Sequence, residues 1–192
     1  PGEYTSRNKK AIRYLEEGKR AFEYKKDDVA EKNFIKALET DPGFIEAAIG
    51  LANLYQLNNR HEEAIVYFKK AIDRQLQAKD DYGLSIAYSG YGTLMEERGQ
   101  RTEAQLLFEK SLALKRKLNE VSGETILLIH LANLQQEMGH RDSSALLLLE
   151  AEKLAEKNDL KKELISIYNK LADYYEQTDS KRSIGYYKKY DA

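Results

Sequence analysis

The feature that most constrains this chain is a set of small and aromatic residues that returns at a nearly fixed interval. The first mark is a small residue, which recurs at intervals of 34, 40, 40 and 40 residues: Gly18, Ala52, Gly92, Ala132 and Ala172. A second small residue comes twelve positions after each of the first four: Ala30, Ala64, Ala104 and Ser144. A large apolar residue follows four positions later: Phe34, Phe68, Phe108 and Leu148. A repeat of this length predicts a stack of similar supersecondary units.

Each unit has the pattern of two amphipathic helices joined by a turn, best seen in residues 45–76. Ala52 and Tyr55 fall on one face of the first helix, and Phe68 falls on the facing side of the second. Small residues let two helix axes approach to about 8–10 Å, and the rings fill the space beside the contact. Asn59 suits the left-handed backbone position that ends the first helix.

The order of these marks resembles a known repeat family. The first unit carries, in order, Tyr14, Gly18, Ala30, Phe34, Ala37 and the pair Asp41-Pro42. These residues and their spacing resemble the tetratricopeptide repeat over nearly the whole chain. The resemblance implies an all-α fold, namely a right-handed α-solenoid of five antiparallel helix pairs (a TPR-like superhelix). It implies binding of a protein or peptide and names no partner.

We expect one repeat domain over residues 1–192, with units at about 9–42, 43–79, 80–119, 120–159 and 160–192. The longer interval of the later units predicts longer helices. The polar residues 1–8 are predicted to form a frayed lead-in. Four residues near the junctions between successive units are candidate N-terminal caps of the helices that follow: Asp41, Asp80, Ser122 and Asp159.

The fifth unit departs from the pattern. Its second helix fits only with one residue deleted, which places Ser183 in the small position and Tyr187 in the aromatic position. Tyr186, Tyr187 and Tyr190 are then expected to be exposed. We therefore expect that the natural protein continues beyond Ala192, or that a partner or a second copy covers this end.

Composition argues against several function classes. The chain has 31 Lys and Arg against 32 Asp and Glu, so no charge excess favours nucleic acid or an anionic membrane. No apolar run approaches 18 residues, so membrane insertion is not expected. With no cysteine and with His61, His130 and His140 in different units, neither a metal site nor a cofactor is predicted. We predict a protein that is not an enzyme, and the compartment stays open.

The surface predicted to carry function is a concave groove lined by the first helix of each unit. The residue after each small position is expected to point into it: Lys19, Asn53, Thr93, Asn133 and Asp173. Residues three before the small position share that side: Leu15, Ile49, Ser89, Ile129 and Asn169. His130 lies on the inner side of its helix. Asparagine amides can pair with the backbone of an extended peptide, and the alternative is that they are only solvated.

The leading hypothesis is a non-catalytic scaffold that binds a protein or an extended peptide in this groove. Its lengthened repeats resemble those of bacterial signalling and regulatory proteins, in which it could be an input or assembly segment. A second hypothesis is a self-assembly module, with Leu146, Leu149 and the closing tyrosines forming a homodimer through the C-terminal units. A third is a small-ligand sensor with a pocket near His130, Asn133 and Asn169.

Overall fold

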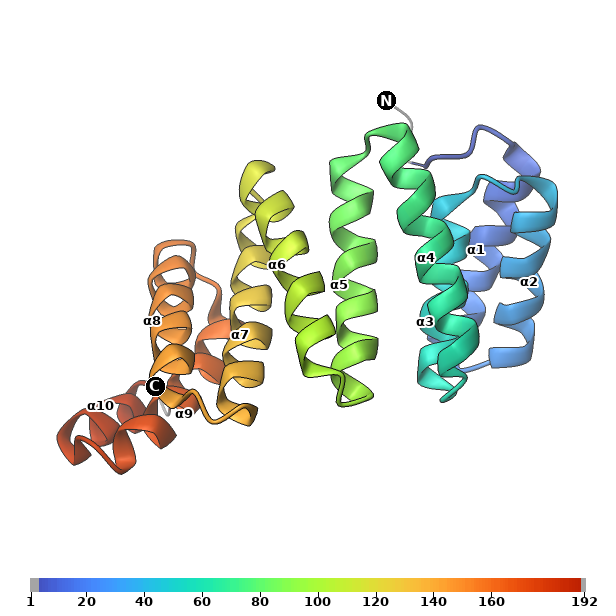
Figure 1. Ribbon diagram of the computed structural model, residues 1–192. Helices are drawn as coiled ribbons and strands as arrows, with labels where there is room; N and C mark the ends of the chain where they lie inside the picture. The colour runs from blue at the N-terminus through green and yellow to red at the C-terminus, as the bar shows by residue number, and fades with distance from the viewer. Residues whose placement is uncertain (1–3, 191–192) are drawn as a thin grey trace. The chain divides into compact units, whose positions relative to one another are not determined.

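The structure is a computed structural model, and it describes residues 4–190. Those residues form ten α-helices and contain no strand. The helices are α1 (Lys9–Glu23), α2 (Asp27–Thr40), α3 (Ile45–Leu57), α4 (His61–Ala78), α5 (Asp81–Glu97), α6 (Arg101–Lys117), α7 (Val121–Glu137), α8 (Arg141–Lys157), α9 (Lys161–Glu176) and α10 (Ser180–Tyr190) (Figure 1). They follow one another as five pairs, so the all-α class and the helix pairs predicted from the repeat are confirmed.

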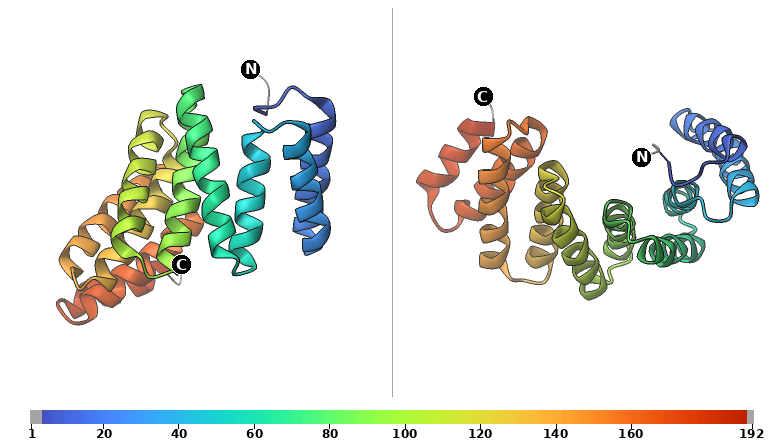
Figure 2. Two further views of the ribbon diagram at one scale, coloured as in Figure 1. Left: turned by 45° about the vertical axis from the view of Figure 1, so that its right-hand side comes forward. Right: turned by 90° about the horizontal axis from the view of Figure 1, so that it is seen from above.

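The contacts of the chain cluster in two units, one ending at Leu94 and the other beginning at Met95. In the first unit α3 lies against α1, α2 and α4, and in the second unit α7 lies against α6, α8 and α9 (Figure 2). Odd-numbered helices therefore contact one another within each unit. No comparable contact joins α2 to α4 or α6 to α8 among the described residues. That the repeats form a single domain stays a prediction.

Small residues allow the close approach of the helices, and phenylalanine rings fill the space beside them. The small residues of the first helices are all buried: Gly18, Ala52, Gly92, Ala132 and Ala172. A Cβ atom built on Gly18 would lie only 2.7 Å from the ring of Phe34, so a larger residue would displace that ring. Phe34, Phe68 and Phe108 are no more than 1% exposed. Burying one such ring contributes about 2–3 kcal/mol, so each ring stabilises the core of the unit to which it belongs.

Left-handed residues end seven of the helices. The backbone φ is +57° at Asn59, as predicted, and +70° and +84° at Gly99 and Gly139. The same conformation occurs at Lys25, Lys79, Asn119 and Asp159. In each turn the following N–H bonds back to a carbonyl of the last helical turn, as Arg60 does to Tyr55 at 2.8 Å. These bonds satisfy carbonyls that the helix end leaves unpaired, and the next helix begins two residues later.

The predicted caps have different outcomes. Asp80 caps α5, since its Oδ1 accepts an N–H of the first turn at 3.1 Å. Asp41 instead accepts an N–H within the connection, and α3 begins only at Ile45. Ser122 lies inside α7, whose first turn is capped by Glu120. Asp159 is a left-handed turn residue, so the predictions for Asp41, Ser122 and Asp159 are wrong.

The described part of the lead-in, residues 4–8, is packed rather than frayed. The ring of Tyr4 meets that of Phe44 edge to face, with centroids 6.1 Å apart. The N–H of Thr5 donates to Glu46 at 2.9 Å. Asn8 caps α1 by accepting two N–H groups of its first turn. The prediction was wrong for these residues because Phe44 and Glu46, the partners of Tyr4 and Thr5, lie about 40 positions away at the start of α3. Residues 1–3 lie outside the described part.

The C-terminal helix packs through a different tyrosine from the one predicted. The ring of Tyr186 stacks on Tyr175 with centroids 5.8 Å apart, and its hydroxyl donates to a carboxylate of α8 at 3.0 Å. Tyr187 is 37% exposed and Tyr190 is 44% exposed. Ser183 is buried, as expected for the small position. Tyr186 is therefore not exposed, and Tyr187 is not the packed ring.

Candidate functional site

The residues predicted to line the groove belong to both units, so each set is described by itself. The first unit carries five of them: Lys19, Ile49, Asn53, Ser89 and Thr93. The second unit carries the other five: Ile129, His130, Asn133, Asn169 and Asp173. None of the ten is buried, and Lys19, Asn169 and Asp173 are exposed. Leu15, predicted to extend the strip, is 0% exposed and belongs to the core instead.

Two of the first helices present the same pair of side chains. Ile49 and Asn53 stand four residues apart on α3, and Ile129 and Asn133 occupy the same positions on α7. All four side chains are half-buried. Neither asparagine amide forms a hydrogen bond with any residue between 4 and 190. Each pair therefore offers an apolar contact beside an unused donor and acceptor on one helix face.

Several other predicted residues are already engaged within the chain. The Thr93 hydroxyl donates to the Ser89 carbonyl at 3.2 Å, so it bonds to its own helix. The ammonium group of Lys19 lies 4.7 Å from the centre of the Tyr4 ring. Asp173 accepts a hydrogen bond from the hydroxyl of Tyr187 at 3.1 Å, which raises the pKa of that tyrosine. The polar row predicted along the first helices is thus not uniform, and its free amides are on α3, α7 and α9.

His130 makes two contacts inside the second unit. Its Nδ1 lies 2.9 Å from Oε2 of Glu96, and its ring lies against Phe108 with centroids 5.0 Å apart. It is half-buried rather than free on the surface. The imidazole therefore packs on the buried Phe108 ring, while part of its side chain stays accessible to solvent.

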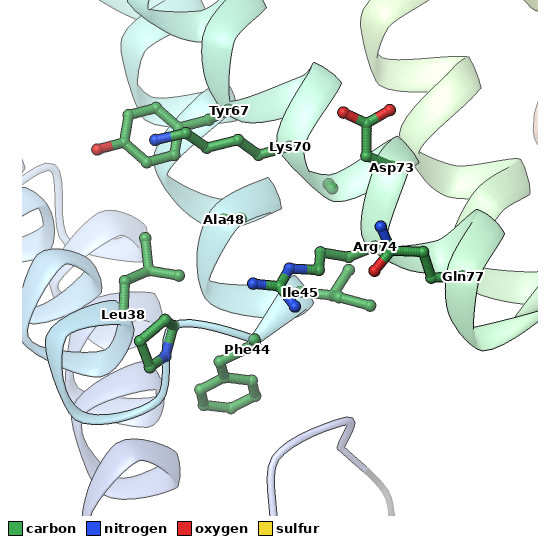
Figure 3. A pocket seen from close by; sticks show the side chains of 12 residues that line it. Leu38, Phe44, Ile45, Ala48, Tyr67, Lys70, Asp73, Arg74 and Gln77 are labelled. Atoms are coloured by element: carbon green, nitrogen blue, oxygen red, sulfur yellow. The ribbon is translucent and has the colours of Figure 1, made fainter.

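A cavity of about 640 Å³ lies in the first unit between α2, the α2–α3 connection, α3 and α4. Apolar residues line its inner part: Leu38, Pro42, Phe44, Ile45, Ala48 and Ala71. Polar and charged residues of α4 line its edge: Tyr67, Lys70, Asp73, Arg74 and Gln77 (Figure 3). The repeat pattern does not predict this cavity. Its only sequence signal is the Pro42-Gly43 connection, which is absent from the later units.

A second cavity, of about 450 Å³, lies in the second unit between the end of α7, the first half of α8 and the end of α9. Its lining includes Arg141, Lys170, Asp173 and Glu176, so both charge signs are present. His130, Asn133 and Asn169 do not line it, although they were predicted to surround a ligand pocket. Arg141 is engaged by Gln177 at 2.5 Å, which leaves a small and largely self-paired site.

Among residues 4–190, no three His, Asp or Glu side chains are placed to share a metal ion. In the same part of the chain, no helix combines the length and apolar character needed to cross a bilayer.

Known proteins share the repeat pattern and the fold of this chain. Residues 44–117 match the family model described as tetratricopeptide repeat. No relative was found among curated proteins.

Solved structures share the fold at low sequence identity. The tetratricopeptide repeat sensor of a signal transduction ATPase with numerous domains from Pyrococcus horikoshii has a TM-score of 0.84 at 22% identity, over 94% of this chain and 28% of that one. PilF of Pseudomonas aeruginosa has a TM-score of 0.78 at 18% identity, over 94% and 75%. TPR-like repeats of a putative kinesin light chain from Podospora anserina have a TM-score of 0.78 at 15% identity, over 97% and 96%.

Proposed function

We propose that this chain, whose residues 44–117 match the tetratricopeptide-repeat family model, is a non-catalytic scaffold that binds an extended segment of a partner protein along its odd-numbered helices. Proteins built of such repeats generally serve as protein-interaction scaffolds. The finer assignment, to a groove lined by α1, α3, α5, α7 and α9, is a proposal. So is a role as the input or assembly segment of a signalling protein, which is supported only by likeness of fold to a repeat sensor.

The observation that carries the proposal is the unused amide of Asn53 and of Asn133. Each follows a fully buried alanine, so its backbone is held in place by the packing of the helix pair. An amide that makes no bond within the described residues can donate to and accept from a peptide backbone at the same time. Such pairing depends little on partner sequence, while Ile49 and Ile129 can contact a partner side chain beside it.

The test is a double substitution of the two amides. Partners captured from a lysate by the wild-type chain should bind the variant Asn53→Ala plus Asn133→Ala at least about tenfold more weakly. The reason is that the hydrogen bonds from the two half-buried amides to the partner's backbone are lost. The matched control is Gln100→Ala plus Asn158→Ala, which removes two exposed amides in the turns, outside the odd-numbered helices. Equal binding by the first variant and the wild type would refute the groove assignment.

The exposed leucines of α6 and α8 favour an alternative function, that of a homo-oligomerisation module. Leu146 on α8 is 68% exposed, and Leu106 in the same register on α6 is 51% exposed. Leu149 is half-buried and Tyr186 is packed within the chain, so the surface named from sequence is smaller than expected. Light scattering at high concentration tests this alternative: Leu146→Glu plus Leu106→Glu should dissociate any dimer, and a wild-type monomer would rule it out.

A further inference from the structure

We propose that the cavity lined by α2, α3 and α4 is a second binding site, which takes a short acidic segment of a partner protein carrying one bulky apolar side chain. The site is separate from the odd-helix groove, because its charged edge is formed by α4. All of its lining residues belong to the unit that ends at Leu94.

The inner part of the cavity is suited to an apolar group. Phe44 is 0% exposed and Ala71 is 1% exposed, so they form the closed floor of the cavity. Exposed Pro42 and half-buried Leu38 offer apolar surface to a ligand. The Tyr4 ring packs edge to face on Phe44, which braces that ring. A volume of about 640 Å³ lies within the usual range of ligand sites, about 300–1,000 Å³. It can hold a large side chain together with adjoining peptide backbone.

The edge of the cavity carries two cations with no ionic partner. Lys70 and Arg74 stand four residues apart on α4 and form no ion pair with any residue from 4 to 190. Lys70 only lies over the ring of Tyr67, at 4.9 Å from its centre. By contrast Arg60, the residue directly before α4, binds both Glu31 and Glu63 at about 3 Å. An arginine and a lysine left unpaired beside an apolar cavity are complementary to carboxylates that flank an apolar side chain.

The one acidic residue at the cavity does not cancel this preference. Asp73 points away from Phe44 and Leu38, whereas the Arg74 guanidinium reaches toward Ile45 (Figure 3). Nor does the repeat pattern require the two cations, since the positions 40 residues on are Lys110 and Leu114. The pair is therefore a local feature of α4 rather than part of the packing scheme.

The probe for this site is an acetylated, fluorescein-labelled pentapeptide, Glu-Glu-Phe-Glu-Glu, added to the full chain and followed by fluorescence anisotropy. The variant Lys70→Glu plus Arg74→Glu should weaken binding at least about tenfold, because two attractions become repulsions. The control Lys32→Glu plus Lys69→Glu makes the same change of net charge at two exposed lysines outside the cavity and should bind within about twofold of wild type. Replacing the phenylalanine of the peptide by alanine should also weaken binding.

NMR of the alanine methyl groups shows independently where on the protein the peptide binds. Addition of the peptide should shift the methyl signals of Ala48 and Ala71, which line the cavity. The variant Asn53→Ala plus Asn133→Ala should bind this peptide normally, so failure of the groove proposal would leave this result unchanged. The inference is overturned by equal loss in the two charge-reversal variants, by loss in the asparagine variant, or by no binding at concentrations on the order of 1 mM.

Discussion

The imidazole of His130 lies against the ring of Phe108, with centroids 5.0 Å apart, at a position that glycine occupies in the two preceding first helices. In those helices the corresponding contacts are Phe34 with Gly50 and Phe68 with Gly90. A Cβ atom on Gly50 would lie 2.9 Å from Phe34. The Phe34 ring thus packs between Gly18 of its own pair and Gly50 of the next. Phe68 and Phe108 likewise contact the first helix of the next pair. The α7 helix meets that ring with an aromatic side chain instead of bare backbone.

The first prediction concerns Gly90, whose added Cβ atom would lie 2.7 Å from the Phe68 ring. Alanine normally stabilises a helix interior by about 1 kcal/mol relative to glycine. Here the buried ring cannot move away cheaply, and overpacking costs about 1–3 kcal/mol. Gly90→Ala should therefore lower the free energy of unfolding by about 1 kcal/mol, measured by urea denaturation.

Gly185 on α10 provides the matched control for that substitution. No atom lies within 4 Å of a Cβ built there, so Gly185→Ala gains helix propensity without a clash. It should raise stability by about 0.5 kcal/mol, since the position is close to the end of its helix. A Gly90→Ala protein as stable as Gly185→Ala would contradict the packing described for Phe68.

The second prediction tests whether the His130 ring stabilises the fold. His130→Ala loses the contact with Phe108 and the link to Glu96, and should cost about 1 kcal/mol in urea denaturation. His130→Phe keeps the ring contact and should cost less. His140→Ala, at an exposed position before α8, should change stability by less than about 0.5 kcal/mol. Equal effects of His130→Ala and His140→Ala would show that the ring contact contributes little.

The sequence was sufficient to predict the helix pairs, because small residues and rings at fixed intervals are required by helix packing itself. It could not predict the order of residues 4–8. Their stability depends on Phe44 and Glu46, whose positions relative to Tyr4 and Thr5 follow from tertiary structure. For the same reason the C-terminal helix was misread: Tyr186 rather than Tyr187 reaches Tyr175.

Helix register was sufficient to predict which residues of the candidate groove share one helix face, but not which hydrogen bonds they form. Register places Asn53, Thr93 and Asn133 just after a buried small residue, and none of them is buried. It does not show that the Thr93 hydroxyl bonds to its own helix while the two amides stay unused. The cavity beside Arg74 depends on the space between three elements, and no periodic pattern encodes such a space.

The third prediction concerns the ion pair of Lys115 and Glu120, at 2.6 Å in the second unit. Burial by itself would raise the pKa of Glu120, but hydrogen bonds from Lys115 and the Gly123 N–H lower it below the ordinary value of 4.5. A lowered folded pKa gives stability that is present above the unfolded pKa and is lost as the pH falls through the folded pKa. Glu120→Gln should therefore cost about 1–2 kcal/mol at pH 7, and the difference from wild type should shrink below about pH 4.

The comparison for this pair is Arg101 with Glu137, whose atoms are 2.8 Å apart but whose side chains are nearly half exposed. Because water screens an exposed pair, Glu137→Gln should cost less than about 1 kcal/mol at pH 7. Urea denaturation of both variants at pH 7 and pH 3.5 separates the two cases. A Glu120→Gln effect that is independent of pH would mean that lost packing, rather than charge, causes it.

The fourth prediction follows from the contact of Tyr55 with Glu31. The Tyr55 hydroxyl donates to Glu31 at 2.9 Å, and burial followed by this bond raises the pKa of Tyr55 from 10.0 to about 12. A raised folded pKa gives stability that is complete below the unfolded pKa and is lost as the pH rises through the folded pKa. The window is therefore pH 10 to about 12, and across it the wild type should lose about 2 kcal/mol more stability than Tyr55→Phe.

The chain has thirteen other tyrosines, so only the difference between matched variants isolates Tyr55. Tyr24 is 71% exposed, and Tyr24→Phe should follow the wild-type curve from pH 8 to 11.5 in urea denaturation. Tyr55→Phe should be less stable than wild type at pH 8, because the Glu31 carboxylate loses a donor, and the two curves should converge as the pH rises. Parallel curves over that range would mean that the Tyr55 hydroxyl is not held neutral by Glu31, and that Arg60, which binds the same carboxylate at 2.9 Å, supplies the whole interaction.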